Sequence, residues 1–243
     1  MNILIPMAGL GDRFKREGYD KPKPLIDVNG KPMIQRVIES LGFKGQYIFV
    51  INKNIEQVEA LKQLLNTLTI NPIIVEIDYI TEGPASTCLL AKEYIKDDEL
   101  IITNCDQIME WDGMQFISFA ETFSKINIEG LVVTYNVLTE KNSYVKLDEN
   151  DVYAVEFAEK KIISDHSLNG IHYWNNGSDF IKSAESMIQK NIRVNNEFYI
   201  APTYNEMILE NKRVSLYPIK NEQHWAVGTP EDLKIYLDHV NKI

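Results

Sequence analysis

The chain has 243 residues, of which 44% are hydrophobic, and a formal net charge of −10 at pH 7. This length suits one sizeable hydrophobic core, and no apolar run in the sequence is long enough to cross a bilayer. The first residues lack the charged, then apolar, then small-residue pattern of a secretory signal, so we expect a cytoplasmic protein outside any membrane. Cys88 and Cys105 both stand beside apolar residues, which favours reduced structural thiols over a disulfide framework or a zinc site.

The first half of the chain alternates between buried strands and amphipathic helices. Four short apolar runs are typical of strands buried on both faces: 2–7, 47–51, 73–77 and 100–103. Between them, apolar residues of 34–41 and of 55–68 fall on one helical face each. This alternation predicts a parallel sheet covered by helices, with ligands bound beyond the carboxyl ends of the strands.

The second half is mixed. Residues 131–137 are strand-like, and 144–147 with 152–157 flank a turn at 148–151 as a hairpin. The sequence shows no repeat, low-complexity tract or linker, so we expect a single domain over residues 1–243.

Two helix starts are predicted near the carboxyl end. We expect Ser178 to cap a helix that extends to Asn191. Thr229-Pro230-Glu231-Asp232 resembles a capping box that opens the final helix.

A glycine-bearing turn follows the first strand. Gly9 and Gly11, next to Ala8, carry no Cβ and can adopt backbone angles that other residues disfavour, so backbone N–H groups there can approach phosphate oxygens closely. The dinucleotide fingerprint is excluded because Phe14 stands where its third glycine would be, and the Gly-Lys-Ser/Thr of a Walker loop is absent. The alternative is that the glycines only make a tight turn.

The segment from Arg13 to Lys23 is a cationic loop. It holds five cations and two anions, a balance of +3 that leaves −13 for the remainder of the chain. Because most of the surface would repel nucleic acid, this loop favours a small anionic ligand over a long polyanion. Otherwise its lysines form a solvated face.

These blocks carry a resemblance to a known family. Residues 9–14 (Gly-Leu-Gly-Asp-Arg-Phe), 22–25 (Pro-Lys-Pro-Leu) and 30–33 (Gly-Lys-Pro-Met) resemble, in order, the signature of the sugar-phosphate nucleotidylyltransferases. The resemblance implies a three-layer α/β/α Rossmann-like nucleotidyltransferase (GT-A-like) fold with a mixed, mostly parallel central sheet. It also implies a nucleotide-binding half at 1–130, an acceptor-binding half at 131–243, and a possible homo-oligomer.

The resemblance further implies a Mg²⁺-dependent transfer of NMP from an NTP to a phosphomonoester, with release of pyrophosphate. Residues 81–87 resemble the loop that recognises the nucleobase, although they could simply be a surface turn before a helix. The resulting nucleotide-binding candidates are Ala8, Gly9, Gly11, Arg13, Lys23, Glu82 and Gly83.

Asp106 is the candidate metal ligand. It follows the strand at 100–103 and resembles the family aspartate that binds Mg²⁺, which can be anchored by one carboxylate together with phosphate oxygens and water. Arg13, Lys23 and Asp106 are therefore the candidate catalytic residues. The alternative role for Asp106 is a turn or helix cap. Ile108 excludes the Asp-x-Asp motif of a related glycosyltransferase.

Three later blocks imply an acceptor pocket. Residues 155–161 resemble the Glu-Lys-Pro block in which Glu contacts acceptor hydroxyls and Lys its phosphate, with Lys161 here in place of proline. Residues 169–174 resemble the following Gly-x-Tyr strand, and 196–199 a block whose Glu touches the acceptor. The acceptor-binding candidates are Glu159, Lys160, Gly170 and Glu197; each block alone could be an ordinary charged edge or hairpin.

One departure from the family pattern concerns the metal. Residues 224–230 resemble Trp-x-Asp-x-Gly-Thr-Pro, but Ala226 stands where a second metal-binding Asp is expected. Either Asp106 holds Mg²⁺ with phosphate and water, or Glu197, His224 or another group contributes.

Several runs also resemble a compact subgroup associated with bacterial capsule polysaccharide pathways, which includes a CTP:phosphoglutamine cytidylyltransferase. That resemblance favours CTP and phosphoglutamine as substrates. The alternatives are a thymidylyl-, uridylyl- or cytidylyltransferase acting on a sugar 1-phosphate, and a nucleotide-binding regulatory paralogue without chemistry.

Overall fold

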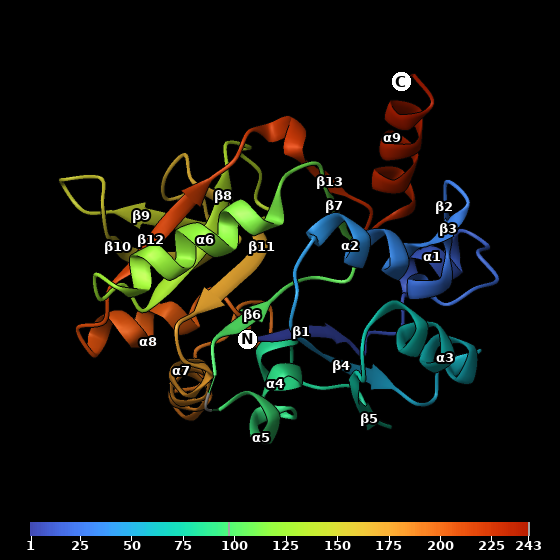
Figure 1. Ribbon diagram of the computed structural model, residues 1–243, viewed down its shortest axis with the longest axis horizontal. Helices are drawn as coiled ribbons and strands as arrows, with labels where there is room; N and C mark the ends of the chain where they lie inside the picture. The colour runs from blue at the N-terminus through green and yellow to red at the C-terminus, as the bar shows by residue number, and fades with distance from the viewer. Residues whose placement is uncertain (97, 243) are drawn as a thin grey trace.

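The computed structural model describes residues 1–96 and 98–242, and Figure 1 shows a twisted sheet with helices on both sides. The elements of its first half are β1 (Asn2–Met7), α1 (Asp12–Arg16), η1 (Lys23–Leu25), β2 (Asp27–Val28), β3 (Lys31–Pro32), α2 (Met33–Leu41), β4 (Gln46–Asn52), α3 (Val58–Leu68), β5 (Ile73–Ile77), α4 (Pro84–Leu89), α5 (Lys92–Ile95), β6 (Leu100–Ile102), β7 (Gln107–Met109) and α6 (Gly113–Ser124). The second half contains β8 (Gly130–Tyr135), β9 (Ser143–Leu147), β10 (Ala154–Glu159), β11 (Ser167–Trp174), α7 (Gly177–Gln189), α8 (Thr203–Leu209), β12 (Val214–Pro218), η2 (Asn221–Gln223), β13 (His224–Ala226) and α9 (Pro230–Val240).

The central sheet has nine strands, seven of them in the order β10-β9-β11-β6-β1-β4-β5, while β8 pairs with β11 and β12. β1, β4, β5 and β6 are parallel to one another. β11 and β10 run against the other strands of the sheet. The mixed, mostly parallel sheet predicted from the sequence is therefore confirmed.

Successive side chains of the central strands point to opposite faces of the sheet. Ile3 and Ile5 of β1 belong to a core built with α2, α3 and α6, whereas Leu4 belongs to a core built with α4, α5, α7 and α8. All three side chains are fully buried. These two cores are the two interfaces of a three-layer α/β/α fold.

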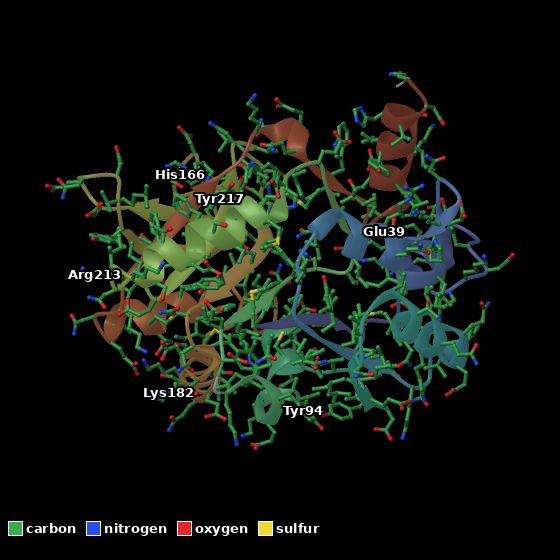
Figure 2. All side chains as sticks on the ribbon, in the orientation of Figure 1. Glu39, Tyr94, His166, Lys182, Arg213 and Tyr217 are labelled. Carbon is green, nitrogen blue, oxygen red and sulfur yellow. The ribbon has the colours of Figure 1, made fainter. Side chains whose placement is uncertain are left out.

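Aromatic side chains hold α6 against the sheet. Figure 2 labels Tyr217 of β12 beside this helix, where its ring meets Phe116 and Phe119 edge-on, with centroids 5.2 and 5.1 Å apart. The sequence analysis predicts neither α6 nor β12, although Phe116, Phe119, Ala120 and Phe123 of α6 recur at helical spacing. No helix within residues 1–96 and 98–242 is long and apolar enough to span a membrane.

Most predicted elements occur at the expected positions, and one cap does not. β9 and β10 form the antiparallel hairpin, and the Thr229 hydroxyl caps α9 by accepting from the Asp232 N–H at 3.1 Å. The Ser178 prediction is wrong: the side chain of Asn176 caps α7, accepting from the Ser178 N–H at 2.8 Å. Asn and Ser are both good caps, and with Asn176 as the cap the helix begins at Gly177, two residues earlier than a Ser178 cap would allow.

The last helix packs on the first loop. α9 contributes Leu233 and Tyr236 to a small core with Phe14 of α1 and Val28 of β2, and Figure 1 shows α9 standing beside α1. The strand before α9, β13, pairs antiparallel with β7, matching Ala226 with Gln107. The last helix and the segment that follows β1 thus pack together near the carboxyl ends of β1 and β6.

Candidate active site

The positions of β1 and β6 bring the two best sequence candidates together. The strands are adjacent and parallel, with Leu4 opposite Ile102, so the residues that follow them emerge at the same edge of the sheet. Ala8 to Gly11 follow β1, and Asn104 to Asp106 follow β6. As expected for an open α/β sheet, this edge carries the polar side chains.

Gly11 allows the glycine turn to touch the basic loop. Its φ of +69° lies in the left-handed region, and a Cβ there would stand 3.1 Å from the Lys23 Cβ. A larger residue would therefore be strained and would push Lys23 away. At Gly9, by contrast, a Cβ would meet no described atom within 4 Å, so that side of the turn is open.

Lys23 reaches across to Asp106 and forms an ion pair with its carboxylate. Burial works against the charge of Lys23, but the attraction of Asp106 outweighs it and leaves the pKa of the ammonium raised. Arg13 acts in the opposite direction on that pKa, which places a second cation nearby. The three predicted catalytic residues are thus gathered at one place.

A cavity of about 890 Å³ opens at this edge of the sheet. It is lined by Arg13 and Asp106 and, from the second half of the chain, by Glu159, Lys160 and Gly170. Its volume falls within the range of small-molecule sites. One concave surface therefore joins Arg13, one of the seven predicted nucleotide-binding residues, and Asp106 to three of the four predicted acceptor-binding residues.

The acceptor side combines a buried carboxylate with a cation. Glu159 accepts a hydrogen bond from the Ser143 hydroxyl, and its burial raises the pKa of the carboxyl despite opposing effects of Ser143 and Lys160. Lys160 has a φ of +56°, and its N–H donates to the Asn142 carbonyl at 3.0 Å. Glu159 and Lys160 thus line the cavity even though Lys161 stands in place of the family's proline.

Gly170 lies against the end of β6. With a φ of +95°, a Cβ at this position would overlap the amide nitrogen of the Asn104 side chain. A glycine is required on both counts, and it allows β11 to line the cavity with backbone.

The predicted base loop is arranged differently from the other candidates. The Glu82 carboxylate pairs with Arg193 at 3.0 Å, and Glu82 is not among the described residues that line the cavity, although Pro84 is. Gly83 has a φ of +124°, and a Cβ there would stand 2.6 Å from backbone atoms of Phe198. Gly83 thus allows close contact with the chain around Phe198.

Glu197 also lies outside the described cavity lining, and its carboxylate accepts from the Tyr199 hydroxyl. Tyr199 itself lines the cavity. The sequence analysis selected Glu197 because the resemblance assigns the Glu of this block to the acceptor, and so it missed the phenol of Tyr199.

The position of the missing second aspartate is beside Asp106. Ala226 lines the same cavity, the Val227 N–H donates to the Asp106 carbonyl at 2.9 Å, and a Cβ on Gly228 would stand 2.5 Å from Asp106 Oδ2. Burial lowers the pKa of nearby His224 to about 4, although Asp106 and Asp232 raise it. His224 is therefore a neutral ring on the cavity wall at pH 7.

His172 is another residue that sequence reasoning missed. It lines the cavity from β11, is 5% exposed, and its Nδ1 has no hydrogen-bond partner among the described residues. Burial lowers its pKa to about 3. A lone histidine in a strand gives no sequence signal that separates it from an ordinary core residue.

Residues 3–112, just under half of the chain, match the family model of the MobA-like NTP transferase domain. A mannose-1-phosphate guanyltransferase from Yarrowia lipolytica is 28% identical over 261 residues, covering 100% of this chain and 66% of that protein. The bifunctional protein GlmU from Methanocaldococcus jannaschii is 26% identical and covers 99% of this chain and 55% of that protein. The chain thus spans roughly half to two thirds of the length of these curated relatives.

Solved structures agree on the architecture. A nucleoside-diphosphate-sugar pyrophosphorylase from Vibrio cholerae superposes with a TM-score of 0.85 at 22% identity, covering 97% of this chain and 99% of that one. The inositol-1-phosphate CTP transferase from T. maritima superposes with a TM-score of 0.74 at 15% identity, covering 99% and 96%. The fold is the α/β nucleotidyltransferase fold, and two of the proteins named here are a guanyltransferase and a CTP transferase.

Proposed function

We propose that the protein transfers a nucleoside monophosphate from an NTP to a phosphomonoester and releases pyrophosphate. The observation that carries the proposal is that Arg13, Lys23 and Asp106 meet beside a cavity that Lys160 also lines. Cations from both halves of the chain would face a triphosphate and an acceptor phosphate. The names of the relatives support the same class of reaction.

The reaction needs no nucleophile from the protein. A phosphomonoester has a second pKa near 6, so the acceptor is largely a dianion at pH 7, and its oxygen can attack the α-phosphorus while pyrophosphate leaves in line. The chain has to position the two substrates and neutralise the charge that spreads over the transferring group. Arg13, Lys23 and the backbone N–H groups of Gly9 and Gly11 would serve the triphosphate, and Lys160 the acceptor.

Asp106 fits a magnesium ion that arrives with the nucleotide. The described residues contain no group of three or more His, Cys, Asp or Glu that could hold a metal alone. One carboxylate in a cavity is nevertheless a suitable anchor, because Mg²⁺ takes its other ligands from phosphates and water. When bound, the ion would neutralise phosphate charge.

The finer proposal is that the nucleotide is CTP and the acceptor is phosphoglutamine, in the synthesis of a capsule precursor in the cytoplasm. It rests on the sequence resemblance and on Ala226, a departure expected for an unusual acceptor. Glu140, Lys141 and Glu159 also line the cavity, so groups of both signs are present for an acceptor with an amino-acid end. A homo-oligomer remains an expectation from the resemblance.

A sugar 1-phosphate is the second candidate acceptor, because mannose 1-phosphate and inositol 1-phosphate appear in the names of a relative and a neighbour. A regulatory protein that binds NTP without chemistry is the third candidate. These three differ in what they consume and release.

Pyrophosphate release separates the three candidates. The protein is incubated with CTP, UTP, dTTP, GTP or ATP, each with Mg²⁺ and with phosphoglutamine, hexose 1-phosphates or inositol 1-phosphate. Fastest release with CTP and phosphoglutamine is the expected result. Faster turnover of a sugar 1-phosphate would select the second candidate, and tight NTP binding without release from any pair would reject transfer altogether.

A further inference from the structure

Tyr199 connects the two sides of the cavity. Its hydroxyl accepts a hydrogen bond from the Lys160 ammonium and donates one to the Glu197 carboxylate. The Lys160 nitrogen also lies 4.4 Å from the centre of the Tyr199 ring, within the range of a cation–π contact. Tyr199 therefore holds the flexible side chain of Lys160 at its ammonium group.

The backbone next to Tyr199 is fixed to the nucleotide side. The Phe198 N–H donates to the Glu82 carbonyl at 2.7 Å, and the Ala85 N–H donates to the Phe198 carbonyl at 3.0 Å. Gly83 allows this approach, as its missing Cβ leaves room for the Phe198 backbone. Phe198 is fully buried, with the Arg193 guanidinium 3.9 Å from its ring centre. Two backbone hydrogen bonds thus join the predicted base loop to Phe198, the residue before Tyr199.

The chain of hydrogen bonds has a fixed direction. A phenol has one proton that it can donate and oxygen lone pairs that can accept. The phenol donates this proton in its hydrogen bond to Glu197, and a lone pair on its oxygen accepts from the Lys160 ammonium. An ammonium has three donors, so two remain free to meet an anion in the cavity.

We infer that Tyr199 is the positioning residue that aims Lys160 at the acceptor's phosphate, and that Glu197 acts through Tyr199 instead of touching the acceptor. The inference rests on the proposed function for the role of Lys160. It links Lys160, which extends from a hairpin of the second half, to the predicted base loop of the first half through Tyr199 and the Phe198 backbone.

The test compares Tyr199→Phe with the wild type. This change keeps the ring under Lys160 and removes only the hydroxyl. Loss of one hydrogen bond to a charged group should raise the KM for the acceptor about tenfold, while the KM for the NTP stays within about twofold. Tyr94→Phe is the matched control, because it removes a hydroxyl from an exposed side chain on α5, on the outer helix layer in Figure 2.

Variants of Glu197 test whether this carboxylate acts through Tyr199 or contacts the acceptor directly. Glu197→Ala should raise the KM for the acceptor in the same direction as Tyr199→Phe, and Glu197→Gln, which keeps an oxygen to accept from the phenol, should restore most of the loss. If both Glu197 variants raise the acceptor KM equally while Tyr199→Phe has no effect, Glu197 contacts the acceptor directly and the inference is wrong.

A second readout does not depend on turnover. Inorganic phosphate is titrated into each protein in a calorimeter. Lys160→Met should remove a phosphate-binding event, and Tyr199→Phe should weaken that event several-fold. Equal phosphate binding by Tyr199→Phe and the wild type overturns the inference, as does phosphate binding that Lys160→Met leaves unchanged. If the wild type releases no pyrophosphate from any substrate pair, the proposed function fails, and the phosphate titration still decides the role of Tyr199.

Discussion

Lys23 and Asp106 stand 83 positions apart in the chain and form an ion pair at the carboxyl edge of the sheet. Lys23 begins the short turn η1, and Asp106 follows β6, so the pair joins the basic loop to the centre of the fold. In this ion pair each side chain neutralises the charge of the other. Binding of a triphosphate with its metal would replace this pair by contacts to phosphate, which gives both residues a measurable role.

Lys23→Ala should lower turnover by about 100-fold to 1000-fold while the protein remains folded, since a preorganised cation at the developing charge typically contributes that much. Lys21→Ala is the matched control, as this exposed neighbour carries the same charge. Pyrophosphate release measures turnover and circular dichroism checks the fold. Near-normal release by a folded Lys23→Ala protein would remove Lys23 from the site.

Ala226→Asp should tighten the binding of divalent cations. Ala226 lines the cavity beside Asp106, so a carboxylate there would supply a second oxygen ligand. We expect the apparent Kd for Mn²⁺, followed by electron paramagnetic resonance in the presence of CTP, to fall about tenfold or more. An unchanged Kd would mean that the two positions do not share a metal, whatever the variant does to activity.

Gly228→Ala should displace Asp106. The added methyl would stand 2.5 Å from Oδ2 of Asp106, closer than real contacts allow. Turnover should fall at least about tenfold, and the Mg²⁺ concentration for half-maximal rate should rise. A variant that melts at the wild-type temperature yet keeps the wild-type Mg²⁺ requirement would contradict this arrangement.

Glu159→Gln should stabilise the fold at neutral pH. The pKa of Glu159 is raised in the native state, so native protein holds this proton more tightly than the unfolded chain does, and ionisation costs stability as pH rises from the unfolded pKa through the native one. The variant should gain about 2–4 °C in Tm at pH 7, the shift that about 1 kcal/mol produces in a protein of this size. Its gain should vanish near pH 4.

The control for this prediction is Glu156→Gln on the same strand, where the side chain is exposed. It should leave Tm nearly unchanged at both pH values. A gain for Glu159→Gln that is equally large at low pH would point to packing instead of charge as its cause.

Much of the fold could be predicted because its elements carry local signals. Short apolar runs mark four strands in the sequence: β1, β4, β5 and β6. Their alternation with helices predicts a parallel sheet. β7 and β13 carry no such signal: each has three residues, and they pair only because distant parts of the chain bring them together. The Ser178 cap failed for a related reason, since Asn176 offered an equivalent side chain two residues earlier.

The site candidates divide in the same way. Arg13, Lys23 and Asp106 lie in motifs that can be found along the sequence, and the fold gathers them. Tyr199 and His172 could not be found, because their importance comes from what surrounds them: a lysine from a hairpin in one case, and a buried cavity wall in the other. Residue type alone does not distinguish either from an ordinary aromatic core residue.

The small core beneath α9 has a consequence for how the region after β1 responds to distant changes. Phe14 of α1 shares this core with Val227, Leu233 and Tyr236, which stand far along the chain. Truncating the side chains of α9 would take away part of the apolar cover of Phe14. Damage to the last helix would therefore also loosen the first one, next to the cationic loop.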